Sequence, residues 1–255
     1  MADLSAGMVL DGGRCIHIVE SVWAGGPGMS DSANFVRVNN ILLGWLERPT
    51  LKWLAAHSPP WMTPDIYTAI GLSGSLLSFI GYLQSRSHPA FFWLATFGFL
   101  VNWYGDSLDG TLARYRHIER PVYGFFSDHV MDVISAVLFF VGLGLSPYVT
   151  FGVAVLTLVA FLMMSALVFL RTSVVGEFRL SYAMLGTTEA RALAILLNTA
   201  MFFFRAQRWP VQVGSLGVLP LNPYDVCIAI FGLLLLCFFV TTAWSESVRL
   251  RRAAK

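Results

Sequence analysis

Residues 106–132 read DSLDGTLARYRHIERPVYGFFSDHVMD and place four aspartates, Asp106, Asp109, Asp128 and Asp132, at the ends of two apolar segments. The first two are three residues apart and the last two are four apart, so on helices each pair projects from one face. The connection between the segments is short, which makes the two helices antiparallel neighbours. The sequence therefore predicts that two acidic helix faces meet at one end of the protein.

The chain around this stretch is far more apolar than a soluble domain. Of its 255 residues, 56% are hydrophobic and only 13% are charged, whereas charged residues make up about a quarter of a typical soluble domain. The formal net charge is only +2, so nothing in the charge balance indicates a nucleic-acid partner. The composition indicates an integral membrane protein.

Six apolar runs are close to the ~20 residues that a helix needs to cross the hydrocarbon core. They are Ile66 to Leu83, Ala90 to Leu112, Tyr123 to Leu145, Tyr148 to Leu170, Thr187 to Phe204 and Val226 to Trp244. Lipid offers no partner to free backbone groups, and the runs show no alternation of period two, so each is expected to be a helix rather than a barrel strand. The predicted fold is an all-α integral membrane protein with six transmembrane helices.

The basic residues predict how the protein is oriented. All seventeen Lys and Arg residues except Arg86, Arg205 and Arg208 fall in the N-terminal region, in the second and fourth connections with their helix ends, or in the C-terminal tail. Because positive residues favour the cytoplasmic side, both termini and the connection 114–120 are expected to face the cytoplasm, in the cell inner membrane.

The segment before the first span predicts a juxtamembrane amphipathic helix over residues 34–60. Its apolar residues recur at helical spacing, namely Val38, Ile41, Leu42 and Trp45, as in a helix that lies at the membrane surface. Pro49 is expected to break this helix or to begin a second short helix that ends near Ala56. An ordinary connecting helix packed on the bundle is the alternative.

The remaining boundaries follow from composition. Residues 1–33 are expected to be a disordered leader, because acidic residues and scattered glycines stand where a signal peptide would have a basic start and an apolar core. Residues 61–248 form the expected six-helix domain, and residues 249–255 form a basic cytoplasmic tail.

Four neighbouring aspartates require a cation. Two carboxylates ~6 Å apart repel by roughly 3 kcal/mol at an effective dielectric near 20. All-oxygen ligands suit hard cations, which indicates Mg²⁺ with Mn²⁺ as an alternative. Two divalent ions would balance the four charges. Two metal ions bound side by side stabilise both the attacking and the leaving oxygen in phosphoryl transfer.

The same residues resemble the signature of the CDP-alcohol phosphotransferase (CDP-alcohol phosphatidyltransferase) family. That signature is Asp-x-x-Asp-Gly-x-x-Ala-Arg, a spacer, and Gly-x-x-x-Asp-x-x-x-Asp. Every signature position is filled here, by Asp106, Asp109, Gly110, Ala113 and Arg114, and after nine residues by Gly124, Asp128 and Asp132. The preceding segment Thr63-Pro64-Asp65-x-x-Thr68 stands where relatives often have Thr-Pro-Asn-x-x-Thr, so Asp65 departs from the pattern.

The resemblance implies a role for each matching residue. Asp106, Asp109 and Asp128 would bind metal, and Asp132 would contact the second ion and act as general base on the acceptor hydroxyl. The hydroxyl oxygen would then attack the β-phosphate and expel CMP. The residues that would line the nucleotide pocket are Gly110, Ala113 and Arg114. Gly124 leaves the backbone bare for a ligand, although tight helix packing is the alternative role for such glycines.

Three further residues are candidates for the site. His129 follows Asp128, as in family members that use CDP-choline or CDP-ethanolamine, and is either a second proton acceptor or an ordinary packed or interfacial histidine. Glu189 and Arg191 stand at the start of the fifth span, where a helix N-terminus could receive a phosphate or the polar head of an acceptor. The alternative is that Glu189 caps the helix and Arg191 extends to the interface.

The expected function is transfer of a phosphoryl-linked alcohol from a CDP-alcohol, or from CDP-diacylglycerol, to a lipid or polar alcohol acceptor. Dimers are frequent in the resembling family, so a homodimer is also expected. Two alternatives stay open: an intramembrane Mg²⁺-dependent prenyltransferase, which would release pyrophosphate instead of CMP, and a cation transporter, whose buried acids would carry ions.

Overall fold

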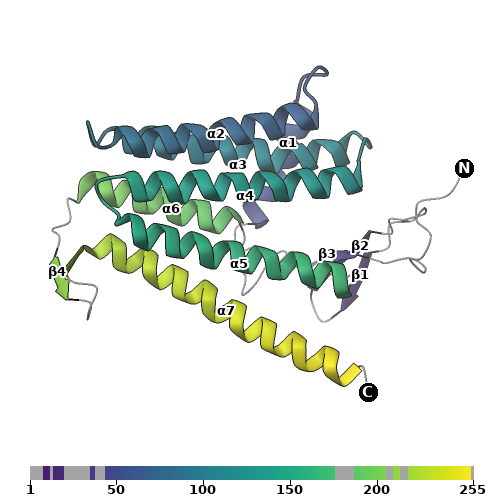
Figure 1. Cartoon of the computed structure of the whole chain (residues 1–255). Coiled ribbons are helices and arrows are strands. Elements are labelled where there is room, and N and C mark those ends of the chain that lie inside the picture. Colours follow the sequence, from purple (N-terminus) through teal and green to yellow (C-terminus); the bar gives the residue numbers. More distant parts are fainter. Residues whose placement is uncertain are drawn as a thin grey trace, which may run out of the picture.

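The computed structural model of the chain describes residues 8–11, 14–19, 35–37, 44–175, 187–204, 209–212 and 218–253. Most of these residues belong to helices: α1 (Gly44–Ala56), α2 (Pro64–Gln84), α3 (Phe91–Tyr115), α4 (Pro121–Leu145), α5 (Phe151–Val175), α6 (Thr187–Phe203) and α7 (Pro223–Ala253). Figure 1 shows α2 to α6 side by side in an up-and-down bundle, with α7 lying along α5.

Within the described part of the chain, four helices are long and apolar enough to cross a membrane: α2, α4, α5 and α7. The other two predicted spans correspond to α3 and α6. Helix α6 has only 17 residues and is too short to count among the four. The 25-residue α3 carries Asp106, Asp109 and Arg114 in its second half. The prediction of a helical, multi-pass membrane protein is therefore confirmed, and the number of six spans stays a prediction.

The helices begin where the sequence supplies the right residues. Thr63 caps α2 because its hydroxyl accepts a hydrogen bond from the Ile66 N–H at 3.3 Å, and Pro64 follows at the first helical position, where its missing N–H costs nothing. Pro121 opens α4 in the same way. The last helix runs on to Ala253, so most of the predicted basic tail is helical.

Short strands were not predicted. β1 (Met8–Asp11), β2 (Arg14–Val19) and β3 (Phe35–Arg37) form an antiparallel sheet in the order β1-β2-β3, mostly within the predicted leader. The β-branched residues of β2 and the Gly12-Gly13 pair before it are typical of a hairpin, a signal that the leader interpretation did not use. A second antiparallel pair, β4 (Trp209–Gln212) and β5 (Val218–Leu221), lies between α6 and α7.

Of the predicted amphipathic helix over residues 34–60, the described residues contain α1, whereas residues 35–37 belong to the strand β3. Helix α1 begins at Gly44, Pro49 lies inside it without ending it, and the predicted apolar positions 38–42 lie outside the described residues. Leu51 and Ala55 are buried against α2 and α3, whereas Trp53 is 60% exposed. One face of α1 thus packs on the bundle, as in the alternative for this segment, and the opposite face is exposed.

Glycines bring α2 and α3 into backbone contact. A Cβ added at Gly74 would lie 2.7 Å from the carbonyl oxygen of Gly98, and one added at Gly81 would lie 2.5 Å from the nitrogen of Ala95. Small residues allow this approach between membrane helices. The close contact fixes the position of α3, which carries Asp106 and Asp109.

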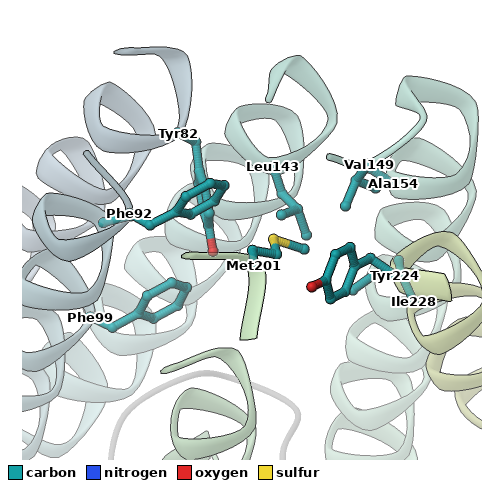
Figure 2. Packing of buried hydrophobic residues seen from close by; sticks show 10 residues of the cluster. Tyr82, Phe92, Phe99, Leu143, Val149, Ala154, Met201, Tyr224 and Ile228 are labelled. Atoms are coloured by element: carbon teal, nitrogen blue, oxygen red, sulfur yellow. The ribbon is translucent and has the colours of Figure 1, made fainter. Parts of the chain in front are cut away.

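A hydrophobic core fills the end of the bundle where α3, α5 and α7 begin (Figure 2). Its largest members are Tyr82, Phe92, Phe99, Met201 and Tyr224. Because the helices alternate in direction, the aspartates lie at the opposite end, where α4 and α6 begin. The core therefore holds one end of the bundle while the other end carries the polar residues.

Candidate active site

A small pocket between α2, α3 and α4 is lined by three of the four signature aspartates. Its lining comprises Thr68, Gly71, Leu72, Asn102, Asp106, Asp109, Asp128, Met131 and Ser135. The free space is about 10 Å³, close to the volume needed for one water-sized group. The acidic faces of α3 and α4 therefore meet at one place.

Asp109 is held by two hydrogen bonds. The Thr68 hydroxyl of α2 donates to its Oδ2 at 2.8 Å, and the N–H of Gly110 donates to its Oδ1 at 2.5 Å. Thr68 lies one turn after Pro64 in α2, so the conformation at the start of α2 determines the direction of a carboxylate in α3.

Asp106 forms an ion pair that crosses the bundle. The Nη2 atom of Arg191, in the second turn of α6, donates to its Oδ2 at 2.7 Å, and both side chains are largely buried, with 9% and 20% of their surface exposed. A buried charge requires such a partner. Arg191 thus points into the protein, so its predicted alternative, extension to the interface, is wrong.

Asp132 follows Asp128 by one helical turn on α4 but is not part of the pocket lining. It is close enough to interact electrostatically with Asp106, Asp128 and Arg191. The fourth aspartate therefore belongs to the same charged cluster, next to the pocket.

The donor atoms of the pocket suit a hard divalent cation. Three carboxylates and the Thr68 hydroxyl supply oxygen, and Asn102, only 2% exposed, has an Oδ1 atom without a hydrogen-bond partner among the described residues. Oxygen ligands of this kind are those of Mg²⁺ and Mn²⁺. Within the described ranges, no three acidic, histidine or cysteine side chains converge closely enough to hold a metal ion in the present arrangement.

The sequence interpretation missed Glu47 of α1. Its carboxylate accepts hydrogen bonds from Trp103 Nε1 at 3.0 Å, from the Ser107 hydroxyl at 3.3 Å and from the Thr188 hydroxyl at 3.0 Å. Glu47 therefore joins α1 to α3 and α6, next to the residues that form the Asp106–Arg191 pair. An isolated acid among the aromatic residues of a juxtamembrane helix was the available signal.

Two arginines tie the connection between α3 and α4 to the rest of the protein. The Arg116 guanidinium donates to the carbonyl oxygens of Ser58, Pro59 and Met62 at 3.0, 2.8 and 2.6 Å. Arg120, in the same connection outside the spans, pairs with Asp65, and the hydrogen bond to that carboxylate raises the pKa of the guanidinium. Asp65, which departs from the family pattern, thus pairs with Arg120 in the spacer between the two halves of the signature.

The residues expected to line the nucleotide pocket lie toward the end of α3 and the start of α4, outside the pocket lining. Arg114 is exposed and donates to the Thr111 hydroxyl at 3.3 Å. A Cβ added at Gly110 would approach the Arg114 side chain at 3.3 Å, and one added at Gly124 would have nothing within 4 Å. Ala113 is half-buried. The tight-packing alternative therefore fails for Gly124.

His129 directly follows Asp128 but is not part of the pocket lining. Its Nδ1 is 2.6 Å from the carbonyl oxygen of Phe125, and its ring packs against Phe125 and Phe169 with centroids 4.2 and 5.0 Å apart. The two predicted roles of His129, second proton acceptor and packed or interfacial histidine, both stay predictions. Glu189 lies in the first turn of α6, and its side chain is buried, with only 6% of the residue surface exposed.

The sequence also matches known proteins. Residues 61–248 match the family model described as CDP-alcohol phosphatidyltransferase. Cholinephosphotransferase 1 of Gallus gallus is 31% identical over 109 residues, 40% of this chain and 32% of that protein. Cholinephosphotransferase 1 of Xenopus laevis is 34% identical over 106 residues, 39% of this chain and 26% of that protein. This chain thus spans about a third or less of the length of these relatives.

The family match covers well over half of the chain and includes the whole stretch from Asp106 to Asp132. The three aspartates that line the pocket and the neighbouring Asp132 are the acidic positions of the signature in that stretch. The chain belongs to the CDP-alcohol phosphatidyltransferase family.

Proposed function

We propose that this protein transfers a phosphoryl-linked alcohol from a CDP-alcohol, or from CDP-diacylglycerol, to an acceptor hydroxyl and releases CMP, a step of phospholipid biosynthesis. The observation that carries the proposal is that Asp106, Asp109 and Asp128 line one pocket between α2, α3 and α4. Membership of the family supports the same reaction.

The four aspartates are the proposed ligands of two Mg²⁺ ions, for which Mn²⁺ is a substitute. When bound, such ions neutralise the charge of a diphosphate and of the departing phosphate group. Thr68 fixes the direction of Asp109, and Arg191 fixes that of Asp106. These contacts keep two carboxylates in place while the substrate binds.

Asp132 is the proposed general base. Its carboxylate takes the proton from the acceptor hydroxyl, whose oxygen forms a bond to the β-phosphorus. The bond from that phosphorus to the bridging oxygen breaks, and CMP leaves with the electron pair. The position of Asp132 one turn after Asp128, outside the pocket lining, supports a role at the edge where an acceptor arrives.

The nucleotide is proposed to bind over the end of α3 and the start of α4. The proposed contacts are Gly110, Ala113, Arg114 and Gly124, with Glu189 and Arg191 on the side of α6. Open space over Gly124 and the exposure of Arg114 support access from the end of the bundle. A second proton-accepting role is proposed for His129, whose ring packs against Phe125 and Phe169.

In the proposed topology α3 and α6 also span the membrane, which gives six spans. Their place among the other helices of the bundle supports this number (Figure 1). The charged residues in the second half of α3, Asp106, Asp109 and Arg114, belong to the proposed site. The aspartates then lie at the cytoplasmic face of the inner membrane. There a CDP-alcohol can reach them from water and CDP-diacylglycerol can reach them from the lipid.

An aminoalcohol is the proposed transferred group. Both relatives described above are named as cholinephosphotransferases, and the Asp128-His129 pair is typical of family members that use CDP-choline or CDP-ethanolamine. A lipid with a free hydroxyl is then the acceptor. A homodimer is proposed from the family alone.

The test is to incubate the purified protein with Mg²⁺, an acceptor lipid and, separately, CDP-choline, CDP-ethanolamine or CDP-diacylglycerol with polar alcohols. With one of these donors, we expect release of CMP and formation of a phospholipid whose mass matches the transferred group plus the acceptor. Chelation of the metal should abolish both CMP release and lipid formation. Asp132→Asn is expected to bind nucleotide but to release no CMP. Release of pyrophosphate, or cation flux without nucleotide turnover, would contradict the proposal.

A further inference from the structure

Glu47 accepts hydrogen bonds from residues that are close in sequence to each partner of the Asp106–Arg191 ion pair. One of its donors, Ser107, directly follows Asp106 in α3, and another, Thr188, precedes Arg191 by three residues in α6. A third donor, Trp103, lies one turn before Ser107. A single carboxylate therefore connects the two helical turns that carry the two partners of the pair.

The geometry of this connection leaves α6 little freedom. The Thr188 hydroxyl contacts both carboxylate oxygens of Glu47, at 3.0 and 3.2 Å, so its position is fixed in direction as well as in distance. Hydrogen bonds to an ionised carboxylate are roughly twice as strong as those between neutral groups. Since Thr188 is in the first turn of α6, these bonds determine where that helix begins relative to α3.

The charge of Arg191 is shared between α1 and the acidic cluster. Its Nη2 donates to Asp106, and its Nη1 is buried without a hydrogen-bond partner among the described residues. Glu47 is close enough to interact electrostatically with the guanidinium. Without Glu47, more of the positive charge of Arg191 acts on the aspartates, which are then weaker ligands for a cation.

We propose that Glu47 is a positioning residue that acts through Arg191: it holds α6 against α3 and thereby sets how strongly the acidic pocket binds a divalent cation. The inference rests on the proposed function only in taking the pocket as a cation site. It assigns to α1 a part in the active site in addition to its packing on the bundle.

The experiment measures Mn²⁺ binding to the purified full-length protein by electron paramagnetic resonance, without nucleotide. We expect Glu47→Ala to weaken binding about tenfold, the size expected for a hydrogen-bonded charged group. Glu47→Gln keeps one acceptor oxygen and is expected to have a smaller effect. Should Glu47→Ala fail to fold, Ser107→Ala and Thr188→Val each remove one donor and should weaken binding a few-fold.

A matched control is Thr150→Val. The Thr150 hydroxyl donates to Asp225 at 3.1 Å at the far end of the bundle, so its loss removes a hydrogen bond to a carboxylate without touching α1 or α6. Mn²⁺ affinity is expected to be unchanged. Equal weakening in this variant would show that any loss of stability affects the pocket and would overturn the inference.

A double-mutant cycle separates positioning from general stability. In an Arg191→Gln background, Glu47→Ala should cause no further change in Mn²⁺ affinity, because the residue through which it acts is gone. The same fold-change in both backgrounds, or unchanged affinity in folded Glu47→Ala, overturns the inference. If Mn²⁺ binding depends on Glu47 but no CDP-alcohol yields CMP, the proposed function fails and the role of Glu47 stands.

Discussion

Thr68 is a residue of α2 that lines the acidic pocket and donates a hydrogen bond to one of its aspartates. Its hydroxyl bonds Asp109 at 2.8 Å, and a carboxylate that loses such a donor gains freedom to turn away from its productive direction. We expect Thr68→Val to lower the rate of CMP release about tenfold, as for the loss of one hydrogen bond to a charged group.

Thr199→Val is a suitable control for that variant. Thr199 lies on α6, and its hydroxyl bonds only its own helix, at the Ile195 carbonyl oxygen, at 2.8 Å. Its replacement should leave CMP release near the rate of the unmodified protein. Comparable losses in both variants would mean that Thr68 has no special relation to Asp109.

At this scale the sequence predicted which aspartates stand together but not what holds them. Spacings of three and four residues bring side chains to one helix face, so the acidic faces of α3 and α4 follow from local geometry. Arg191 pairs with Asp106 across 85 residues of sequence, and Glu47 meets Thr188 across 141. Such pairs depend on how helices pack, which no local pattern encodes.

Among the elements, the α2–α3 pair depends most on small residues. Gly74 faces the backbone of Gly98 so closely that a methyl group there has no room. We expect Gly74→Ala to lower the free energy of unfolding by about 1–3 kcal/mol, the usual cost of overpacking. The measurement is thermal unfolding of the detergent-solubilised protein, followed by size-exclusion chromatography.

Gly152→Ala on α5 provides the comparison, because a Cβ at Gly152 would have nothing within 4 Å. This variant should unfold at the same temperature as the unmodified protein or slightly higher, since alanine is the better helix former. Equal destabilisation of both variants would show that the glycines matter for reasons other than contact between α2 and α3.

Helix positions could be read from the sequence more reliably than the segments around them. Apolar runs of membrane length fix where α2 to α6 begin and end to within a few residues. Pro49 was expected to break the helix or to begin a second short helix ending near Ala56. Helix α1 does end at Ala56, but it runs through Pro49, and Leu51 and Ala55 after the proline pack on the bundle. The β4–β5 pair lies between α6 and α7, where hydropathy gives no information about strands.

At the scale of the whole molecule, successive helices alternate in direction, so connections fall at two opposite ends. Ser87 lies in the connection between α2 and α3, and Glu119 lies in the connection between α3 and α4; both are exposed. The excess of basic residues predicts that the end with Glu119 faces the cytoplasm.

Cysteine labelling in intact cells tests this orientation. After replacement of the native cysteines by serine, a membrane-impermeant maleimide should label Ser87→Cys from outside, and should label Glu119→Cys only after the cells are opened. The reverse pattern would place the aspartates on the outer side and would contradict a cytoplasmic active site.

Backbone contact between α2 and α3 also has a mechanical consequence. Helices that touch at glycines have no side chains there that could change rotamer, so they cannot slide past one another without separating. α7, in contrast, packs along α5 and leaves most of its surface exposed. Amide hydrogen exchange should therefore be slower in the middle of α2 and α3 than in the middle of α7.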